Sequence, residues 1–174
     1  ARLSEAMRVN ITYPANADAL PVSLAMPPPI VVLVQGGLVS VARYQWLATH
    51  LATRGYTVIA PNHLLDLALL AIDNARIALD DALALAVPWL QPALSSEAPV
   101  AVGGHSLGGV VSAHEWDSDS RFSALFLLAS FAAKDEPVEQ STGKPVVSLV
   151  GSTDQKALPD DVFSGFQRFG QPRL

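Results

Sequence analysis

The sequence contains no cysteine, which excludes disulfides, thiol nucleophiles and thiolate metal sites. It also lacks an excess of positive charge, because 11 Lys and Arg residues are outnumbered by 16 Asp and Glu, for a net charge of −5. This balance argues against nucleic acid or anionic lipid as a partner. No apolar run approaches the roughly 18 residues that a membrane-spanning helix needs. We expect a soluble protein without a membrane segment, and the compartment, cytoplasmic or secreted, and the oligomeric state stay open.

The length and composition predict one globular domain over residues 1–174. A chain of 174 residues matches the usual size of a single domain and can bury a full core. Half of the residues are apolar and only 16% are charged, which is far from the composition of disordered chains. The chain begins at Ala1 rather than Met, which suggests that a leading segment has been removed.

Five short runs rich in Val, Ile and Leu predict buried strands. They cover residues 30–34, 57–60, 99–104, 124–128 and 146–150. Their apolar character is continuous rather than alternating, which is typical of strands covered by helices on both faces. A further segment, residues 8–13, predicts an extra strand at an edge of the sheet.

Helical patterns separate these runs. They cover residues 42–54 and 65–87, the segment after Ser106, and residues 160–169. Asp160 and Asp161 would begin the last helix, where acidic side chains favour the helix dipole. Strands that alternate with helices predict an α/β fold with a doubly wound, mostly parallel sheet and right-handed crossovers.

The strongest chemical signal is Gly104-His105-Ser106-Leu107-Gly108-Gly109, a G-x-S-x-G motif between a predicted strand and a predicted helix. A turn this sharp holds its serine in a strained backbone conformation, and the residues two before and two after it have no room for a Cβ. Gly104 and Gly108 occupy those positions. The motif predicts a nucleophile elbow that presents Ser106 above the carboxyl ends of the strands.

A second signal is Gln35-Gly36-Gly37, directly after the first buried strand. Acyl transfer needs N–H donors aimed at the oxyanion that forms on the attacked carbonyl. The residue after the nucleophile, here Leu107, normally gives one donor, and a loop after an early strand gives the other. We expect Gly37 to be that second donor, although the two glycines would also suit an ordinary loop.

A third signal is Gly151-Ser152-Thr153-Asp154, just after the last predicted strand. A carboxylate at this edge of the sheet would hold a histidine in the required tautomer and stabilise its protonated form. Asp154 is therefore the candidate acid, and a solvated loop aspartate is the alternative.

Residues 31–38, 56–63 and 104–109 together resemble the α/β-hydrolase superfamily, in particular its chlorophyllase/cutinase-like and dienelactone-hydrolase-like branch. The resemblance covers most of the chain from Val31 onward. It implies esterase chemistry with a Ser-Asp-His triad in that chain order and no cofactor. On it, Ser106 matches the nucleophile and Asp154 the acid, while Leu107 and Gly37 match the oxyanion donors.

The sequence departs from this pattern at the histidine, since none follows Asp154. The four histidines are His50, His63, His105 and His114. We expect His105 to be structural and His114 to lie on a helix surface. His50 would act at most as a cation at a helix end, and His63 could either line the pocket or be a loop residue without a role. Residues 171–174 look like the start of a strand cut short. The sequence therefore suggests that a C-terminal strand and the histidine loop lie beyond the given chain.

The sequence says less about the substrate than about the reaction. Only residues 130–145 separate two of the predicted strands, which is too little for a cap domain, so we expect an open site that admits bulky or amphiphilic esters. Leu38, Leu107 and Phe131 could provide apolar walls. Two alternatives stay open: a hydrolase-like binding domain that has lost its base, and a thioesterase, amidase or acyltransferase that uses the same serine.

Overall fold

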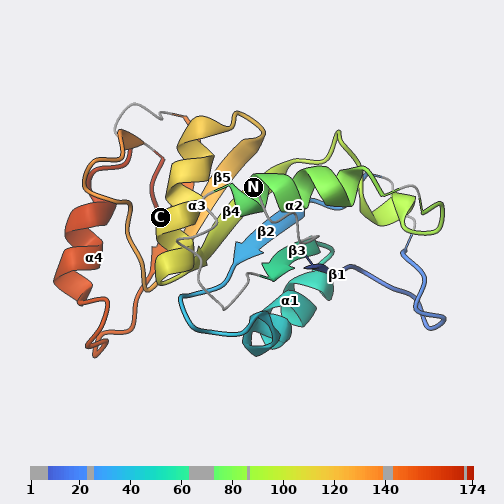
Figure 1. Ribbon diagram of the computed structural model, residues 1–174, viewed down its shortest axis with the longest axis horizontal. Coiled ribbons are helices and arrows are strands. Elements are labelled where there is room, and N and C mark those ends of the chain that lie inside the picture. The colour runs from blue at the N-terminus through green and yellow to red at the C-terminus, as the bar shows by residue number, and fades with distance from the viewer. Residues whose placement is uncertain (1–7, 23–25, 63–72, 86, 139–142, 171) are drawn as a thin grey trace, which may run out of the picture.

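A six-stranded sheet forms the centre of the computed structural model, which describes residues 8–22, 26–62, 73–85, 87–138, 143–170 and 172–174 (Figure 1). The strands are β1 (Arg8–Thr12), β2 (Ile30–Val34), β3 (Thr57–Asn62), β4 (Val100–His105), β5 (Phe122–Leu128) and β6 (Val146–Leu149). Their order across the sheet is β1-β3-β2-β4-β5-β6. Strands β2 to β6 pair in parallel, and only the edge strand β1 is antiparallel to its neighbour.

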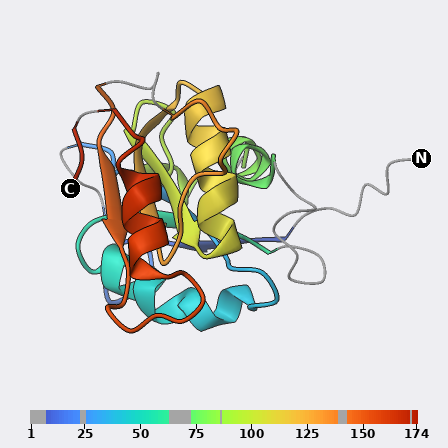
Figure 2. The same cartoon turned by 90° about the vertical axis from the view of Figure 1, so that its left-hand side faces the viewer.

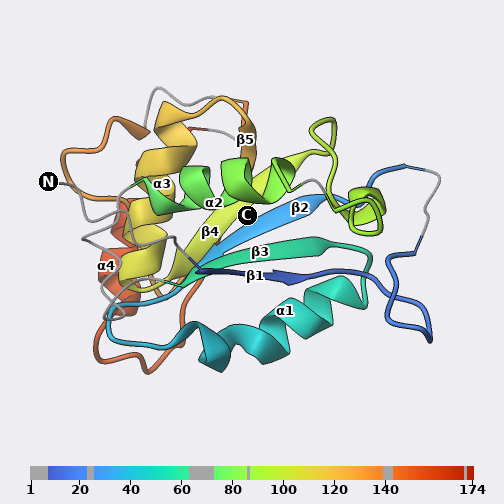
Figure 3. The ribbon, with the colours of Figure 1, turned by 45° about the vertical axis from the view of Figure 1, so that its right-hand side comes forward.

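The helices cover both faces of this sheet. They are α1 (Gln45–Ala52), α2 (Asn74–Leu83), α3 (Leu107–Ser118) and α4 (Pro159–Phe166), with the 3-10 turns η1 (Val41–Tyr44) and η4 (Gln91–Ala93). Figure 3 shows α1 on one face and α2 and α3 on the other. Figure 2, in which the left-hand side of Figure 1 faces the viewer, places α4 in front, at the β6 end of the sheet. The predicted doubly wound, mostly parallel α/β fold is thereby confirmed, and no cap domain is formed by the residues that the structure describes.

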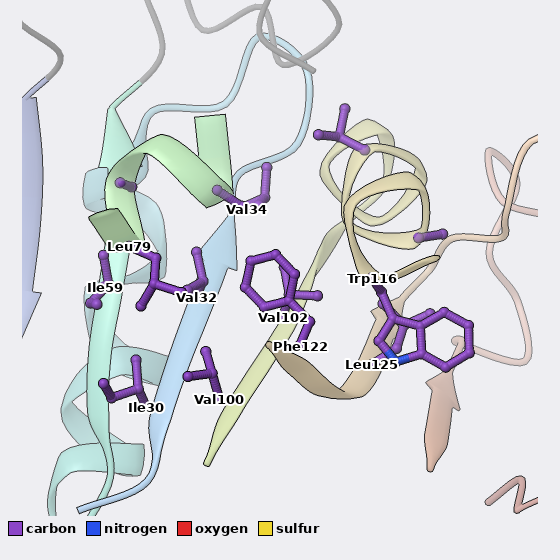
Figure 4. Packing of buried hydrophobic residues seen from close by; sticks show 14 of the residues in the cluster. Ile30, Val32, Val34, Ile59, Leu79, Val100, Val102, Trp116, Phe122 and Leu125 are labelled. Atoms are coloured by element: carbon purple, nitrogen blue, oxygen red, sulfur yellow. The ribbon is translucent and has the colours of Figure 1, made fainter. Parts of the chain in front are cut away.

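The core follows from the alternation of side chains along β2, all five residues of which are buried. Ile30, Val32 and Val34 pack on the face of α2 and α3, together with Leu79, Val102 and Trp116 (Figure 4). Val31 and Leu33 point to the opposite face and pack with Tyr44, Ala48 and Val58. The central strands are thus covered on both sides, as their continuous apolar runs predict.

The predicted strands begin or end within one or two residues of the observed ones. Two helix predictions need correction. The segment predicted as one helix over 42–54 is η1 followed by the shorter α1. Of the helix predicted over 65–87, the described part is α2, which runs from Asn74 and ends at Leu83, four residues before Val87. The first part of the predicted helix, with His63 before it, lies outside the described residues.

None of the helices in the described part of the chain is both long and apolar enough to cross a membrane.

Residues 172–174 lie beside β6, where Arg173 forms a parallel bridge with Val146. The N–H of Leu174 donates to the Val146 carbonyl at 2.9 Å, and the Ser148 N–H donates to the Leu174 carbonyl at 3.1 Å. Residues 172–174 therefore have the direction of β6.

Candidate active site

Ser106 lies in the turn between β4 and α3 with φ 52° and ψ −125°, a backbone conformation that non-glycine residues rarely adopt. Its N–H donates to the Leu128 carbonyl at 3.0 Å, and its own carbonyl accepts from the Gly109 N–H at 2.9 Å. The residue is exposed although it is flanked by buried glycines. The turn therefore lifts the hydroxyl out of the sheet and into solvent at the N-terminus of α3.

The glycines on either side make this turn possible. A Cβ on Gly104 would lie 2.5 Å from the Val34 carbonyl oxygen, and one on Gly108 would lie 2.3 Å from that of Gln35. Both obstacles are backbone atoms that cannot rotate away. The close approach of α3 to the end of β2 thus requires glycine at both positions.

Several residues with a strained backbone conformation lie at the same edge of the sheet as Ser106. Among the described residues, the non-glycine positions with positive φ are Ala19, Leu38, Ser106 and Ala129. Three of them, Leu38, Ser106 and Ala129, follow β2, β4 and β5, whose carboxyl ends share one edge of the sheet. Strained residues are typically retained where function needs a particular geometry.

Ser130, directly after β5, supports the same turn. Its buried hydroxyl donates to the Ser106 carbonyl at 2.6 Å. It also lies against Gly109, where a Cβ would be 2.4 Å from the Ser130 Oγ. Sequence reasoning missed this residue. The available signal is topological, because a polar residue at the end of a strand next to β4 must lie at the edge that carries Ser106.

Gly37 and Leu107, the two residues predicted as oxyanion donors, are neighbours in the structure. A Cβ on Gly37 would be 2.5 Å from the Leu107 Cδ1, so the loop after β2 touches the first residue of α3. The Leu107 N–H has no acceptor inside its own helix, since it belongs to the first turn. The Gly37 N–H donates to no acceptor among the described residues, whereas the Gly36 N–H donates to the Tyr44 hydroxyl at 2.9 Å. Of the two loop amides, Gly37 is the one available to a ligand.

A cavity of about 320 Å³ opens beside Ser106. Its lining includes Leu107, Phe131, Asp154 and Lys156, so two of the three predicted apolar walls border it. Leu38 is 77% exposed and is not part of this lining. The fold thus brings Ser106 and Asp154, which are far apart in the sequence, to one cavity.

The carboxylate of Asp154 is fixed by its own loop. Its Oδ1 accepts hydrogen bonds from the N–H groups of Lys156 at 2.8 Å and Ala157 at 2.9 Å. These two backbone donors hold the pKa of Asp154 below its ordinary value, so the group is ionised near neutral pH. The other oxygen, Oδ2, accepts no hydrogen bond from a described residue and could receive a donor from outside.

No histidine among the described residues forms a hydrogen bond with Ser106 or Asp154. The His105 ring borders the cavity, but its Nδ1 lies 2.9 Å from the Tyr44 hydroxyl. His114 lies on α3, with its Nδ1 3.0 Å from the Glu136 Oε2. His50 is exposed in the last turn of α1, and His63 lies outside the described residues.

Comparisons with known proteins agree with this architecture. The model of the alpha/beta hydrolase family matches residues 30–169. The solved structures of similar fold include two esterases. A PEG-bound cold-adapted esterase from an Arctic intertidal metagenomic library has a TM-score of 0.65 and 18% identity, covering 86% of this chain and 72% of that one. The ferulic acid esterase from Streptomyces cinnamoneus has a TM-score of 0.70 and 22% identity over 89% of this chain.

This chain spans 51% of the Streptomyces enzyme, about half its length. No curated protein sequence matches the chain. At these identities the two solved structures establish the fold alone, and the family model, which covers most of the chain, establishes the family. The chain belongs to the alpha/beta hydrolase family.

Proposed function

We propose that this protein is a serine hydrolase that cleaves carboxylic esters through an acyl-enzyme on Ser106. The observation that carries the proposal is the strained, exposed Ser106 at the N-terminus of α3, beside a cavity that it shares with Asp154. The two solved structures described above are both named as esterases, which supports the same reaction class.

In the proposed mechanism the Ser106 hydroxyl attacks the ester carbonyl and the carbonyl oxygen becomes negative. The N–H groups of Gly37 and Leu107 donate to this oxygen, because neither has an acceptor among the described residues. A histidine takes the Ser106 proton and returns it to the leaving alcohol, and water then releases the acyl group. The Oδ2 of Asp154 accepts from the Nδ1–H of that histidine and orients its ring.

The histidine lies beyond Leu174 in this proposal. Residues 172–174 run parallel to β6, so a continuation in that direction would lead to the edge of the sheet that carries Ser106 and Asp154. His63, which comes directly after Asn62 in the sequence and lies outside the described residues, is the alternative base. Replacing His63 with alanine in the full-length protein distinguishes the two, because activity survives only if the base is elsewhere.

The test of the function is covalent labelling of the full-length protein with a fluorophosphonate, combined with hydrolysis of short-chain nitrophenyl esters. Both should be lost in Ser106→Ala and kept in Ser152→Ala, which changes an exposed serine of a neighbouring loop. A wild-type protein that is folded but neither labels nor hydrolyses would overturn the proposal.

One observation favours a second function. Because no described histidine forms a hydrogen bond with Ser106, the domain would suit a binding protein that kept the turn but lost the base. Such a protein would bind acyl compounds in the cavity without labelling. A thioesterase, amidase or acyltransferase would label like an esterase, so the hydrolysis rates of matched esters, thioesters and amides identify the acceptor chemistry.

A further inference from the structure

The hydroxyl of Tyr44 connects three segments of the chain. Tyr44 ends η1, and its oxygen accepts from the Gly36 N–H in the loop after β2 at 2.9 Å. The same oxygen lies 2.9 Å from the Nδ1 of His105, which ends β4 directly before Ser106. We propose that Tyr44 is a positioning residue, which locks the loop that carries the Gly37 donor to the turn that carries Ser106.

This inference rests on the proposed function, since it assigns a role in the same reaction. Gly37 gives its N–H to the oxyanion, and its position is set by the peptide before it. That peptide is Gly36, whose N–H is held by Tyr44. A displaced Gly36 would move the donor relative to Ser106, and misplacements of the order of 1 Å are enough to impair catalysis.

The positioning role implies a direction for each of these hydrogen bonds. The Tyr44 oxygen accepts the Gly36 N–H, and in the proposed arrangement its own hydroxyl proton is donated to the other neighbour, His105 Nδ1. The nitrogen is then an acceptor, and the proton of a neutral His105 ring sits on Nε2. The alternative, an Nδ1–H that donates to the Tyr44 oxygen, is the tautomer that the experiment below distinguishes.

The environment of Tyr44 suits this role. The side chain is 8% exposed and packs among the apolar residues between α1 and the sheet. Burial raises the pKa of its phenol above the ordinary value, although the Gly36 N–H opposes the shift, so the group stays neutral and can donate. Glycine is required at position 36, because a Cβ there would lie 2.7 Å from His105 Nδ1 and 3.1 Å from the Tyr44 oxygen.

The variant that tests the inference is Tyr44→Phe, which removes the hydroxyl and keeps the buried ring. Its matched control is Tyr13→Phe. Tyr13 donates to the Ala19 carbonyl at 3.1 Å and follows β1, which is antiparallel and ends at the opposite edge of the sheet. Comparison of the two variants separates the loss of this hydroxyl from the loss of any tyrosine hydroxyl.

The first measurement is nuclear magnetic resonance of the ¹⁵N-labelled full-length protein, which needs no activity. In the wild type and in Tyr13→Phe, the His105 ring should show the Nε2–H tautomer, and the Gly36 amide proton should keep the same shift. In Tyr44→Phe, the Gly36 resonance should move and the tautomer preference should weaken. An Nδ1–H tautomer in the wild type, or a Gly36 amide unaffected by Tyr44→Phe, would overturn the inference.

The second measurement separates kcat from KM for a nitrophenyl ester. Loss of a whole oxyanion donor costs about 10²–10³-fold in kcat. A donor that is loosened rather than removed should cost less, so we expect Tyr44→Phe to lower kcat by about 10- to 100-fold with KM nearly unchanged. His105→Ala should lower kcat less, because the Gly36 N–H keeps its acceptor. Tyr13→Phe should match the wild type.

These outcomes distinguish the two proposals. If the wild type hydrolyses esters and Tyr44→Phe does so at the same rate, the positioning role is wrong and the esterase function stands. If the folded wild type neither labels nor hydrolyses, the esterase function fails, and the positioning role fails with it.

Discussion

The buried carboxylate of Glu115 on α3 accepts a hydrogen bond from the backbone N–H of Ala75 on α2 at 3.0 Å. It also accepts from the Arg76 N–H at 3.1 Å, while the residue before α2, Asp73, makes no capping hydrogen bond with its side chain. The first N–H groups of a helix have no acceptor within it. Glu115 therefore caps α2 from the neighbouring helix α3, which directly follows Ser106.

This carboxylate should make stability depend on pH. Burial raises the pKa of Glu115 from 4.5 to about 8, against the opposing effect of the two N–H donors. In the pH range between these values the folded protein binds more protons than the unfolded chain, so stability falls as the pH rises. Glu115 contributes stability below about pH 4.5 that is lost as the pH approaches 8. One pKa unit corresponds to about 1.4 kcal/mol, so the loss amounts to a few kcal/mol.

Glu115→Gln should flatten this part of the stability profile. Glutamine has nearly the same shape and no charge to desolvate, but its amide oxygen replaces only one of the two carboxylate oxygens. Urea unfolding at pH 5, 6.5 and 8 should show a smaller pH slope in the variant and a lower stability at pH 5. Glu97→Gln, at an exposed glutamate, is the control. A slope unchanged by Glu115→Gln would mean that Glu115 is ionised throughout this range.

The close packing of the turn at Ser106 should make the stability of the protein sensitive to a side chain at Gly108. Gly108→Ala should destabilise the protein by about 1–3 kcal/mol or more, because the new Cβ would lie 2.3–2.4 Å from the carbonyl oxygens of Gln35 and Val34. Gly151→Ala is the matched control, since no atom lies within 4 Å of a Cβ there. Thermal unfolding of both variants measures the difference. Equal midpoints would show that α3 can move away from β2 without cost.

Much of the fold could be predicted from local patterns. The run over β2 contains only large apolar residues, which suits a strand buried on both faces, and the glycines around Ser106 indicate a turn with no room for side chains. Each of these patterns involves residues that are neighbours in the sequence. The sequence predicts the ends of the helices less well, because a helix end depends on tertiary packing.

The polar contacts across the fold could not be predicted. Glu115 is 40 residues from its partner Ala75, and Tyr44 is 61 residues from His105. Nothing in the sequence pairs such residues, since each has a plausible local role: Tyr44, for example, has the spacing of a helix residue that packs on the core. Only the order of the strands brings them together.

Trp116 should be a large contributor to stability. It is fully buried on α3, and its ring meets Phe169 edge to face with a centroid distance of 5.8 Å. Trp116→Ala should cost about 3–5 kcal/mol. Trp116→Phe should cost clearly less, because the buried Nε1–H has no acceptor among the described residues and its removal relieves an unpaired donor.

Chemical denaturation followed by circular dichroism measures both Trp116 variants. Trp46→Phe is the control, since Trp46 is 70% exposed and its replacement should change stability by no more than about 0.5 kcal/mol. If Trp116→Phe were as costly as Trp116→Ala, the indole nitrogen would have to be paired.

Asp154→Asn should separate the loop hydrogen bonds of Asp154 from its proposed role as the catalytic acid. Asparagine has an Oδ1 that can accept the same N–H groups of Lys156 and Ala157, so Asp154→Asn should keep the loop and the unfolding temperature. It lacks the negative charge that the proposed histidine needs. In a Ser-His-Asp protease the same change lowers kcat about 10⁴-fold.

We therefore expect Asp154→Asn in the full-length protein to lose ester hydrolysis by roughly three to four orders of magnitude. Ser106 should still be present at the cavity, so slow labelling by a fluorophosphonate should remain detectable. Asp135→Asn, at an exposed aspartate between β5 and β6, should behave like the wild type. If Asp154→Asn retained full kcat, Asp154 would be a loop residue only, and the acid would have to come from another position at the same edge of the sheet.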